Sequence, residues 1–293
     1  MHNEPNVGLI GATSLVGECL IQQLKQNNCH VAAFSRRVIK QDDNQVTWHQ
    51  LVNTKNVTPK TIPAWICVAP IWALPDHFNL LLAHDAQRII VLSSTSRFTK
   101  HNSSDPAEQL TAQRLQEYEA RLRKWAIANG IDWVILRPTL IYGLGRDKNI
   151  TEIARFIQRF GFFPLFGPAK GLRQPIHAED VAIACFNVLF SSDIANQAYN
   201  LSGGETLSYR DMVNQVFAAY HRTPRLITIP RWVFKIAINC ICKLPRYRHW
   251  TTAMAERMNT DLTFDSSDAI QDFNFSPRLF KLEQKDLPLG TAD

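Results

Sequence analysis

Short apolar runs alternate with amphipathic segments along the first half of the chain. Strands are expected at residues 7–10, 30–35, 46–49, 65–69, 89–92 and 133–136. Apolar residues recur at helical spacing in residues 14–27, around Phe78, Leu81 and Leu82, and in residues 105–129. Parallel strands need crossover connections of this length, so the alternation predicts an α/β fold with a doubly wound parallel sheet.

The longest expected helix carries signals at both ends. Asp105 is a suitable N-cap, Pro106 fits the first helical position, and Glu108 would complete a capping box. Asn129 and Gly130 follow the last apolar position of the pattern and are typical of a helix end.

From Gly143 onward, glycine and proline interrupt the pattern more often, and short helices and loops are expected. Residues 175–180 and 199–201 are expected to return to the sheet. The predicted organisation is a Rossmann-type core of residues 1–145, to which residues 174–204 return, and a smaller lobe formed mostly by residues 146–293. Such a lobe would lie over the carboxyl edge of the sheet, where open α/β sheets bind ligands.

Composition narrows the class of protein. The chain has 293 residues, 45% hydrophobic and 20% charged, with a formal net charge of +6. These values are typical of a globular protein and exclude a collagen-like or disordered chain. The six cysteines form no C-x-x-C pair and no zinc-type cluster, and the first residues do not resemble a signal peptide. We therefore expect a reduced, cytoplasmic location and no metal site.

Basic residues gather in one region, between Arg222 and Arg248. The overlapping apolar run, residues 226–242, is interrupted by Pro230 and by charges, so it is too short to span a membrane. Two interpretations stay open: a solvated face beside a buried amphipathic helix, or peripheral contact of residues 226–248 with an anionic substrate or membrane headgroups. No nucleic-acid partner is expected, because no helix-turn-helix or aromatic–basic platform is present. The oligomeric state is left open.

A glycine-rich turn, Gly8-Leu-Ile-Gly11-Ala-Thr-Ser-Leu-Val-Gly17, joins the first strand to the first helix. Gly11 permits a tight turn, and Gly17 lets the helix pack closely on the strand. The start of the helix would offer free N–H groups to a pyrophosphate. We therefore expect a dinucleotide site, the alternative being a merely tight strand-to-helix turn. The residues expected at the cofactor here are Gly8, Gly11, Thr13, Ser14, Leu15 and Val16.

The end of the second strand bears on the choice of cofactor. An NAD site usually has an acid there for the ribose 2′-hydroxyl, but this chain has Ser35, Arg36 and Arg37, with no acid before Asp42. Two arginines favour a 2′-phosphate, so NADP is preferred and NAD stays open. The alternative is that both arginines are simply solvated at a strand end.

Six motifs in order resemble the extended short-chain dehydrogenase/reductase family of sugar-nucleotide epimerases, dehydratases and related reductases. They are Gly11-x-x-Ser14-x-x-Gly17, Leu92-Ser-Ser-Thr95, Leu136-Arg-Pro138, Ile141-Tyr-Gly143, Arg173-Gln-Pro-Ile-His-Ala-Glu-Asp180 and Tyr199-Asn-Leu-Ser-Gly-Gly204. Semialdehyde and acyl-phosphate reductases use a similar turn but need a nucleophilic cysteine. Cys185 is a poor candidate because it lies in an apolar helical pattern.

The resemblance implies roles for single residues. Thr95 matches the hydroxyl residue that hydrogen-bonds the reacting oxygen of the substrate, and Pro138 matches a residue against the nicotinamide ring. Arg173 matches an arginine that binds the diphosphate of sugar-nucleotides. The remaining assignments are Ala69 to the cofactor and Ser94 and Asn149 to the substrate.

One departure from the family concerns its acid–base pair, a tyrosine followed four residues later by a lysine. With Glu119 taken as the family's helix glutamate, that pair falls on Thr111 and Leu115, which cannot replace it. Tyr118, one turn further along, and Tyr142 are the remaining candidates for chemistry, although a tyrosine at either position is more often a packing residue.

Two functions fit these observations. The first is an NAD(P)-dependent oxidoreductase or epimerase acting on a polar, nucleotide-sugar-like small molecule. The second is a catalytically silent NADPH-binding regulatory or scaffold protein. The missing pair favours the second, whereas Thr95, Pro138 and Arg173 favour the first.

Overall fold

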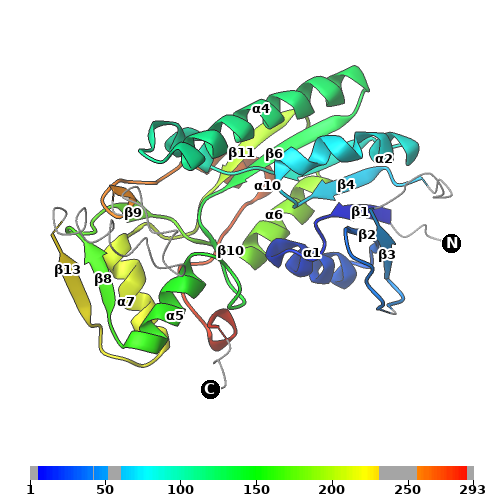
Figure 1. The fold of residues 1–293 in the computed structure, drawn as a ribbon. Coiled ribbons are helices and arrows are strands. Elements are labelled where there is room, and N and C mark those ends of the chain that lie inside the picture. Colours follow the sequence, from blue (N-terminus) through cyan, green and yellow to red (C-terminus); the bar gives the residue numbers. More distant parts are fainter. Residues whose placement is uncertain (1–5, 42, 52–60, 231–255, 289–293) are drawn as a thin grey trace.

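The computed structural model describes residues 6–41, 43–51, 61–230 and 256–288 of the chain. Its central sheet has the strand order β11-β6-β5-β4-β1-β2-β3, and every neighbouring pair is parallel (Figure 1). The strands are β1 Asn6–Ile10, β2 His30–Ser35, β3 Val46–Gln50, β4 Ala64–Cys67, β5 Arg88–Leu92, β6 Asp132–Pro138 and β11 Gln197–Leu201. The predicted α/β fold with a doubly wound parallel sheet is confirmed.

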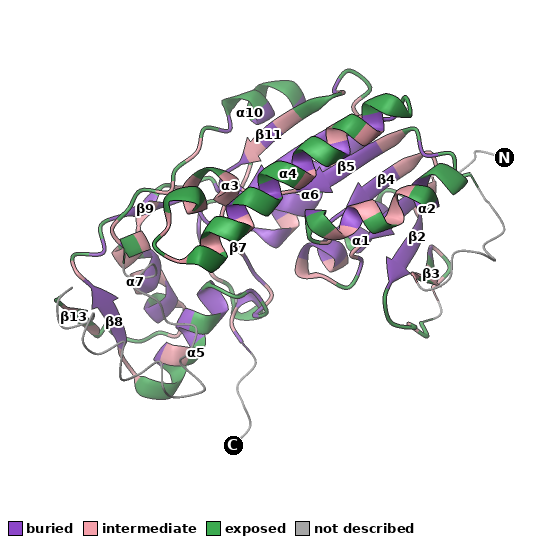
Figure 2. Cartoon of the chain, turned by 45° about the horizontal axis from the view of Figure 1, so that its top comes forward, coloured by how far each residue is buried: buried purple, intermediate pink, exposed green. Residues whose placement is uncertain are grey.

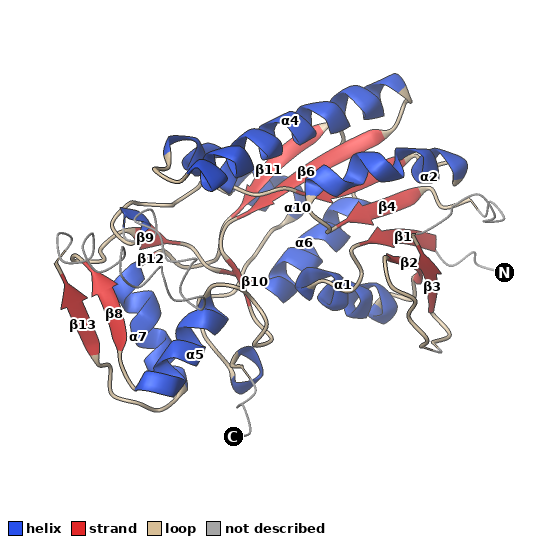
Figure 3. Ribbon diagram, in the orientation of Figure 1, coloured by secondary structure: helices blue, strands red, loops and turns tan. Residues whose placement is uncertain are grey.

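Helices cover both faces of this sheet (Figure 3), which explains why its strands read as continuous apolar runs. In β5, Ile90 and Leu92 pack on one face, whereas Ile89 and Val91 pack on the other. The first face is covered by α1 Leu15–Gln26, α6 Ala178–Phe190 and α10 Ser267–Phe273. The second is covered by η2 Ile71–His77, α2 Phe78–Ala83 and α4 Pro106–Ala128.

The ends of α4 follow the sequence signals, with one difference. Asp105 caps the helix by accepting from the Ala107 N–H at 2.9 Å, Pro106 takes the first position, and Asn129 is the C-cap. Glu108 does not close a capping box with Asp105. Its carboxylate accepts a hydrogen bond from the Ser103 hydroxyl at 2.7 Å instead, because the Asp105 N–H that a capping box would use already donates to Ser103 Oγ at 3.2 Å.

A smaller lobe lies beyond the carboxyl ends of the strands, around a separate buried cluster (Figure 2). It contains α5 Ile150–Phe160, β8 Phe163–Phe166, α7 Tyr209–Ala219 and β13 Leu226–Ile229. Two short strand pairs connect it to the core: β7 Ile141–Tyr142 with β10 Ile176–His177, and β9 Leu172–Arg173 with β12 Leu207–Ser208. The remaining short elements are α3 Ser96–Thr99, η3 Lys100–Asn102 and η5 Gln284–Asp286.

Two predictions about the second half need correction. Residues 199–201 do join the central sheet in β11, but residues 175–180 do not. The β10 strand pairs with β7 outside the sheet, and Ala178 already begins α6, because the His177 ring caps that helix by accepting from the Glu179 N–H.

The expected amphipathic helix over residues 226–242 is also wrong at its start. Residues 226–229 form β13, which pairs in parallel with β8 of the smaller lobe, so this tertiary pairing overrides the helical pattern. Residues 231–248 of the expected membrane-contacting region lie outside the described residues. Within the part of the chain that the structure describes, no helix has the length and hydropathy needed to cross a membrane.

Candidate cofactor and substrate site

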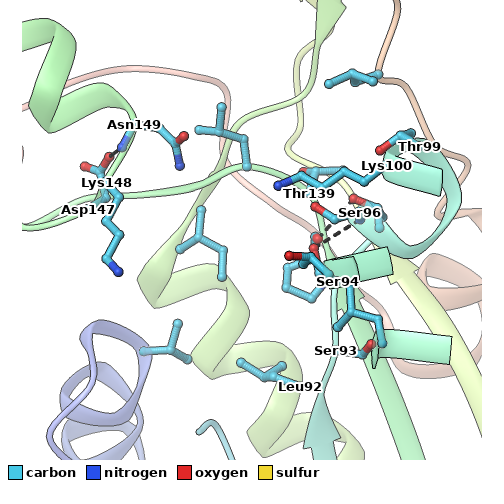
Figure 4. Close-up of a pocket in the computed structure, with 18 of the residues that line it drawn as sticks. Leu92, Ser93, Ser94, Ser96, Thr99, Lys100, Thr139, Asp147, Lys148 and Asn149 are labelled. Atoms are coloured by element: carbon cyan, nitrogen blue, oxygen red, sulfur yellow. Dashed lines mark hydrogen bonds between the residues drawn. The ribbon is translucent and has the colours of Figure 1, made fainter. Parts of the chain in front are cut away.

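A cavity of about 800 Å³ lies at the carboxyl edge of the central sheet, against the smaller lobe. Its floor is formed by the loops after β4, β5 and β6, and its walls by the start of α1, the start of α4 and residues 146–149. The sequence-predicted residues that line it are Ser14, Leu15, Val16, Ala69, Ser94, Thr95, Pro138, Asn149 and Arg173. The structure therefore brings together residues that are widely separated along the chain (Figure 4).

The turn before α1 is shaped by glycine. Gly11 has φ +88°, and a Cβ on it would lie 2.5 Å from the backbone nitrogen of Ala69. The hydroxyl of Ser14 caps α1 by accepting from the Gly17 N–H at 3.1 Å. Gly8 packs beneath this turn with its Cα against the ring of Trp65, and Thr13 is exposed. None of the predicted residues Gly8, Gly11 and Thr13 is part of the cavity lining. Gly8 and Gly11 shape the turn, and Thr13 lies beside it.

The three residues at the end of β2 lie apart from the cavity lining. Ser35 is buried, and its hydroxyl accepts a hydrogen bond from the Arg37 N–H at 3.2 Å. Arg36 and Arg37 are exposed, and no carboxylate of the described residues pairs with either guanidinium. Within the described residues, two cations without a carboxylate partner therefore lie at the end of β2, the strand beside β1 and its glycine turn.

Three hydroxyls follow β5, and each has a different partner. Ser93 donates to the buried Glu119 at 2.5 Å. Thr95 is buried and donates to the Pro138 carbonyl at 3.2 Å. The Ser94 oxygen accepts from the Ser96 N–H at 3.1 Å, which leaves its proton free, and in Figure 4 the Ser94 side chain faces the cavity.

Behind these hydroxyls is a buried ionic cluster. Glu119, which is fully buried, accepts from Arg137 Nε at 3.1 Å and Nη2 at 2.7 Å, and its Oε2 lies 3.1 Å from Arg97 Nη1. Both guanidinium groups lie over the ring of Phe98. The cluster fixes α4 to the ends of β5 and β6, so it positions the cavity floor.

Thr111 and Leu115, the positions to which counting assigns the family's tyrosine and lysine, both line the cavity. The Thr111 hydroxyl donates to the Ala107 carbonyl at 2.8 Å within α4. At these two positions, the chain offers the cavity one hydroxyl that is already hydrogen-bonded and one apolar side chain.

Neither candidate tyrosine lines the cavity. Tyr118 packs against the buried cluster beneath α4. Tyr142 is fully buried, with its ring edge-on to His177 and Phe280. Burial raises the pKa of Tyr142 far above its ordinary value, which opposes proton transfer from it at neutral pH.

Arg173 lines the cavity, but its guanidinium already has partners. Nη1 donates to the carbonyls of Leu172 and Thr260 at 2.6 and 2.8 Å, Nη2 donates to the Arg257 carbonyl, and the guanidinium lies over the Tyr209 ring. Burial lowers the pKa of Arg173 to about 10, so it stays charged at neutral pH. The arginine therefore holds the segment at residues 257–260 as well as facing the cavity.

Sequence reasoning missed four cations of the cavity lining: Lys100, Arg146, Lys148 and Arg257. Lys100 points into the cavity in Figure 4, and burial, with Arg257 nearby, lowers the pKa of its ammonium group. The one lining carboxylate among the described residues, Asp147, is occupied by the Thr151 hydroxyl at 2.7 Å and the Asn149 N–H at 2.8 Å. Lys100 and Arg257 also pair with Glu108, and Arg146 pairs with Glu18. The cations of the lining still outnumber these carboxylates, so the cavity suits an anionic ligand.

Two of these four cations could have been predicted from their position after a strand. Arg146 and Lys148 follow the glycines that end the β6–β7 segment, and polar residues after a strand of a parallel sheet lie at its binding edge. Lys100 also follows a strand, but it lies eight residues beyond the end of β5, after α3. Arg257 carried no such signal, because only tertiary packing brings it next to the segment after β5.

Comparison with known proteins matches part of the chain to a family. Residues 78–202 match the model of the NAD dependent epimerase/dehydratase family. This segment contains β5, α4, β6 and most of the cavity floor, including the Ser93–Thr95 and Arg137–Pro138 motifs. The family that the sequence resembles is thereby confirmed for this segment.

Similar curated proteins are distant. The chain is 26% identical over 221 residues to a 2-alkyl-3-oxoalkanoate reductase of Stenotrophomonas maltophilia, covering 67% of this chain and 66% of the reductase. It is 23% identical over 120 residues to a UDP-glucose 4-epimerase of Vibrio cholerae, covering 41% and 37%. It is 23% identical over 189 residues to the NADH dehydrogenase 1 alpha subcomplex subunit 9 of Arabidopsis thaliana, covering 61% and 45%. The chain thus spans about half or less of the length of several of the curated relatives it matches.

Solved structures share the fold over nearly the whole chain. MoeE5 in complex with UDP-glucose and NAD has a TM-score of 0.69 at 17% identity, covering 94% of each chain. The UDP-N-acetylglucosamine 4-epimerase of Bacillus cereus has a TM-score of 0.67 at 13% identity, covering 94% of this chain and 92% of the epimerase. The Rossmann-type architecture with a smaller second lobe is therefore shared with these proteins.

Proposed function

We propose that this protein is an NAD(P)-dependent oxidoreductase or epimerase of the extended short-chain dehydrogenase/reductase type, with a polar, anionic small-molecule substrate. The observation that carries the proposal is a single cavity. It extends from the start of α1, through Ala69 and Pro138, to the free hydroxyl of Ser94 and the cations beyond. A dinucleotide fits the first part, because Gly11 leaves no side chain over the turn and the N–H groups of α1 face it.

The cationic far part of the cavity supports a phosphorylated substrate. The relatives named as UDP-sugar epimerases and the neighbour with bound UDP-glucose point to the same class, a nucleotide-sugar. A bound nicotinamide would accept or supply hydride at the substrate carbon. Ser94 would then donate a hydrogen bond to the reacting oxygen, with Thr95 beside it, and the Lys100 ammonium would stabilise negative charge there.

The end of β2 supports NADP over NAD, and Arg36→Asp tests this. The variant is expected to bind NADPH at least tenfold more weakly and NADH equally well or better, because a carboxylate repels the 2′-phosphate and accepts from the 2′-hydroxyl. Fluorescence titration of both dinucleotides measures this. Arg121→Asp, the same charge change on the exposed face of α4, should leave both affinities unchanged. A wild type that prefers NADH would contradict the NADP assignment.

Turnover tests the catalytic part of the proposal. With NADPH and a panel of aldehydes, 3-oxo acids and UDP-sugars, Ser94→Ala is expected to lower kcat about a hundredfold, because its hydroxyl proton is free. Thr95→Ala is expected to lower it less, because the Thr95 proton already serves the Pro138 carbonyl. The Kd of NADPH should change in neither variant. Turnover that survives both substitutions would show that these hydroxyls do not serve the reaction.

A second candidate, a catalytically silent NADPH-binding subunit, is favoured by one observation. The cavity positions Thr111 and Leu115 provide no tyrosine and no lysine. The similar Arabidopsis thaliana protein, named as a subunit of NADH dehydrogenase, is in keeping with this alternative. NADPH binding without turnover on the panel would support it.

A further inference from the structure

A bidentate ion pair joins two walls of the cavity. Arg146 Nη1 and Nη2 donate to Glu18 Oε1 and Oε2 at 3.1 and 2.6 Å. Glu18 lies in the first turn of α1, and Arg146 lines the cavity together with Ser14 and Val16. The two side chains are 44% and 50% exposed. The pair therefore lies in solvent beside the N–H groups that would bind a pyrophosphate.

The backbone that carries Arg146 is fixed from the other side. The Leu144 N–H donates to Asp286 Oδ1 at 3.0 Å, and Asp286 is buried and also bonded to His177 Nε2 at 3.0 Å. Gly145 packs directly on the backbone of Leu287, where a Cβ would collide with the carbonyl oxygen. The loop is thus held in place, and only the long side chain of Arg146 is free to change its partner.

Leaving Glu18 for a phosphate group is favourable in free energy for Arg146 when such an anion is bound at α1. An exposed carboxylate–arginine pair contributes little stability, because water and salt screen it. A bidentate bond from a guanidinium to phosphate oxygens is stronger, and the same anion would also face the positive end of α1. Glu18, as long as it is charged, repels an anion at this place and competes for Arg146.

We propose that Arg146 is a phosphate-binding residue that exchanges Glu18 for the pyrophosphate of the bound dinucleotide. Glu18 then acts as an internal competitor that lowers the affinity for the cofactor. This inference rests on the proposed dinucleotide site at α1. It adds to that site a residue from the loop after β7 and a reason for the ion pair.

The test measures the Kd of NADPH for the wild type, Arg146→Ala, Glu18→Gln and the double variant. Arg146→Ala is expected to weaken binding about tenfold through the loss of charged hydrogen bonds. Glu18→Gln is expected to tighten binding about threefold, since it removes both competition and repulsion. In the double variant the gain from Glu18→Gln should be smaller, because no arginine is left to be released.

A matched control exists in the same chain. Glu152→Gln breaks the exposed Glu152–Arg155 pair of α5, which has side chains 61% and 53% exposed, and should leave the Kd and the melting temperature unchanged. If the wild type binds NADPH and Arg146→Ala binds it equally well, the inference is wrong and the dinucleotide site stands. If Arg146→Ala and Glu18→Gln weaken binding equally, the pair is merely structural. If the wild type binds neither NADPH nor NADH, both the site and the inference fail.

Discussion

Replacing Glu119 by glutamine is expected to lower the free energy of unfolding by about 3 kcal/mol. The carboxylate is fully buried and serves three partners, the guanidinium groups of Arg97 and Arg137 and the hydroxyl of Ser93. Glutamine keeps the shape but removes the charge, so two partly buried cations face each other over Phe98 without their counterion. An uncompensated buried charge costs far more than the net value of the original pair.

Urea unfolding followed by circular dichroism measures this change. Glu117→Gln, two residues away on the exposed side of α4, is the matched control and should change the free energy of unfolding by less than about 0.5 kcal/mol. A Glu119→Gln variant as stable as Glu117→Gln would mean that the cluster is solvated and does not fix α4 to the sheet.

The strands and helices of the first half were predictable because local signals agree there with the fold. Both faces of the sheet are covered, so its strands are apolar without alternation, and α4 carries its own N-cap and C-cap. In the second half this agreement ends. Two-residue strands such as β10 have no periodicity to detect, and residues 226–229 read equally well as part of a helix.

The candidate site was predictable where a residue directly follows a strand. Ser94 and Thr95 after β5, Pro138 at the end of β6, and Ser14 after the β1 turn all line the cavity. Tyr118 was chosen for lying one turn beyond the expected lysine position, Leu115. Seven residues separate it from Thr111, so it lies on nearly the same face of α4 but about 10 Å further along, beyond the cavity lining, where it packs against the core. Ser94 and Thr95 differ in the hydrogen-bond partners of their hydroxyls. These partners depend on tertiary contacts, which motif spacing in the sequence does not predict.

Gly11→Ala, which adds one methyl group to the turn before α1, is expected to have the largest effect on cofactor binding. Gly11→Ala should lower the free energy of unfolding by about 2–4 kcal/mol, since φ +88° is strained for alanine and its Cβ would lie 2.5 Å from the Ala69 nitrogen. The neighbouring Val68 N–H is bonded to the Ile10 carbonyl at 2.9 Å, so that backbone cannot retreat without breaking the contact of β1 with β4. The overlap of the added Cβ with the Ala69 nitrogen can therefore be relieved only by movement of the turn itself. The Ser14 N–H is bonded to the Gly11 carbonyl at 2.9 Å, so the start of α1 would shift with it.

A shifted start of α1 no longer aims its N–H groups at the pyrophosphate, and NADPH binding should fall at least a hundredfold. Gly130→Ala separates backbone strain from this contact. Gly130 also has a positive φ, +65°, but nothing lies within 4 Å of where its Cβ would be, and it follows α4 far along the chain from the turn. That variant should lose about 1 kcal/mol of stability and bind NADPH like the wild type. If Gly11→Ala binds NADPH as well as Gly130→Ala does, the pyrophosphate does not lie at the start of α1.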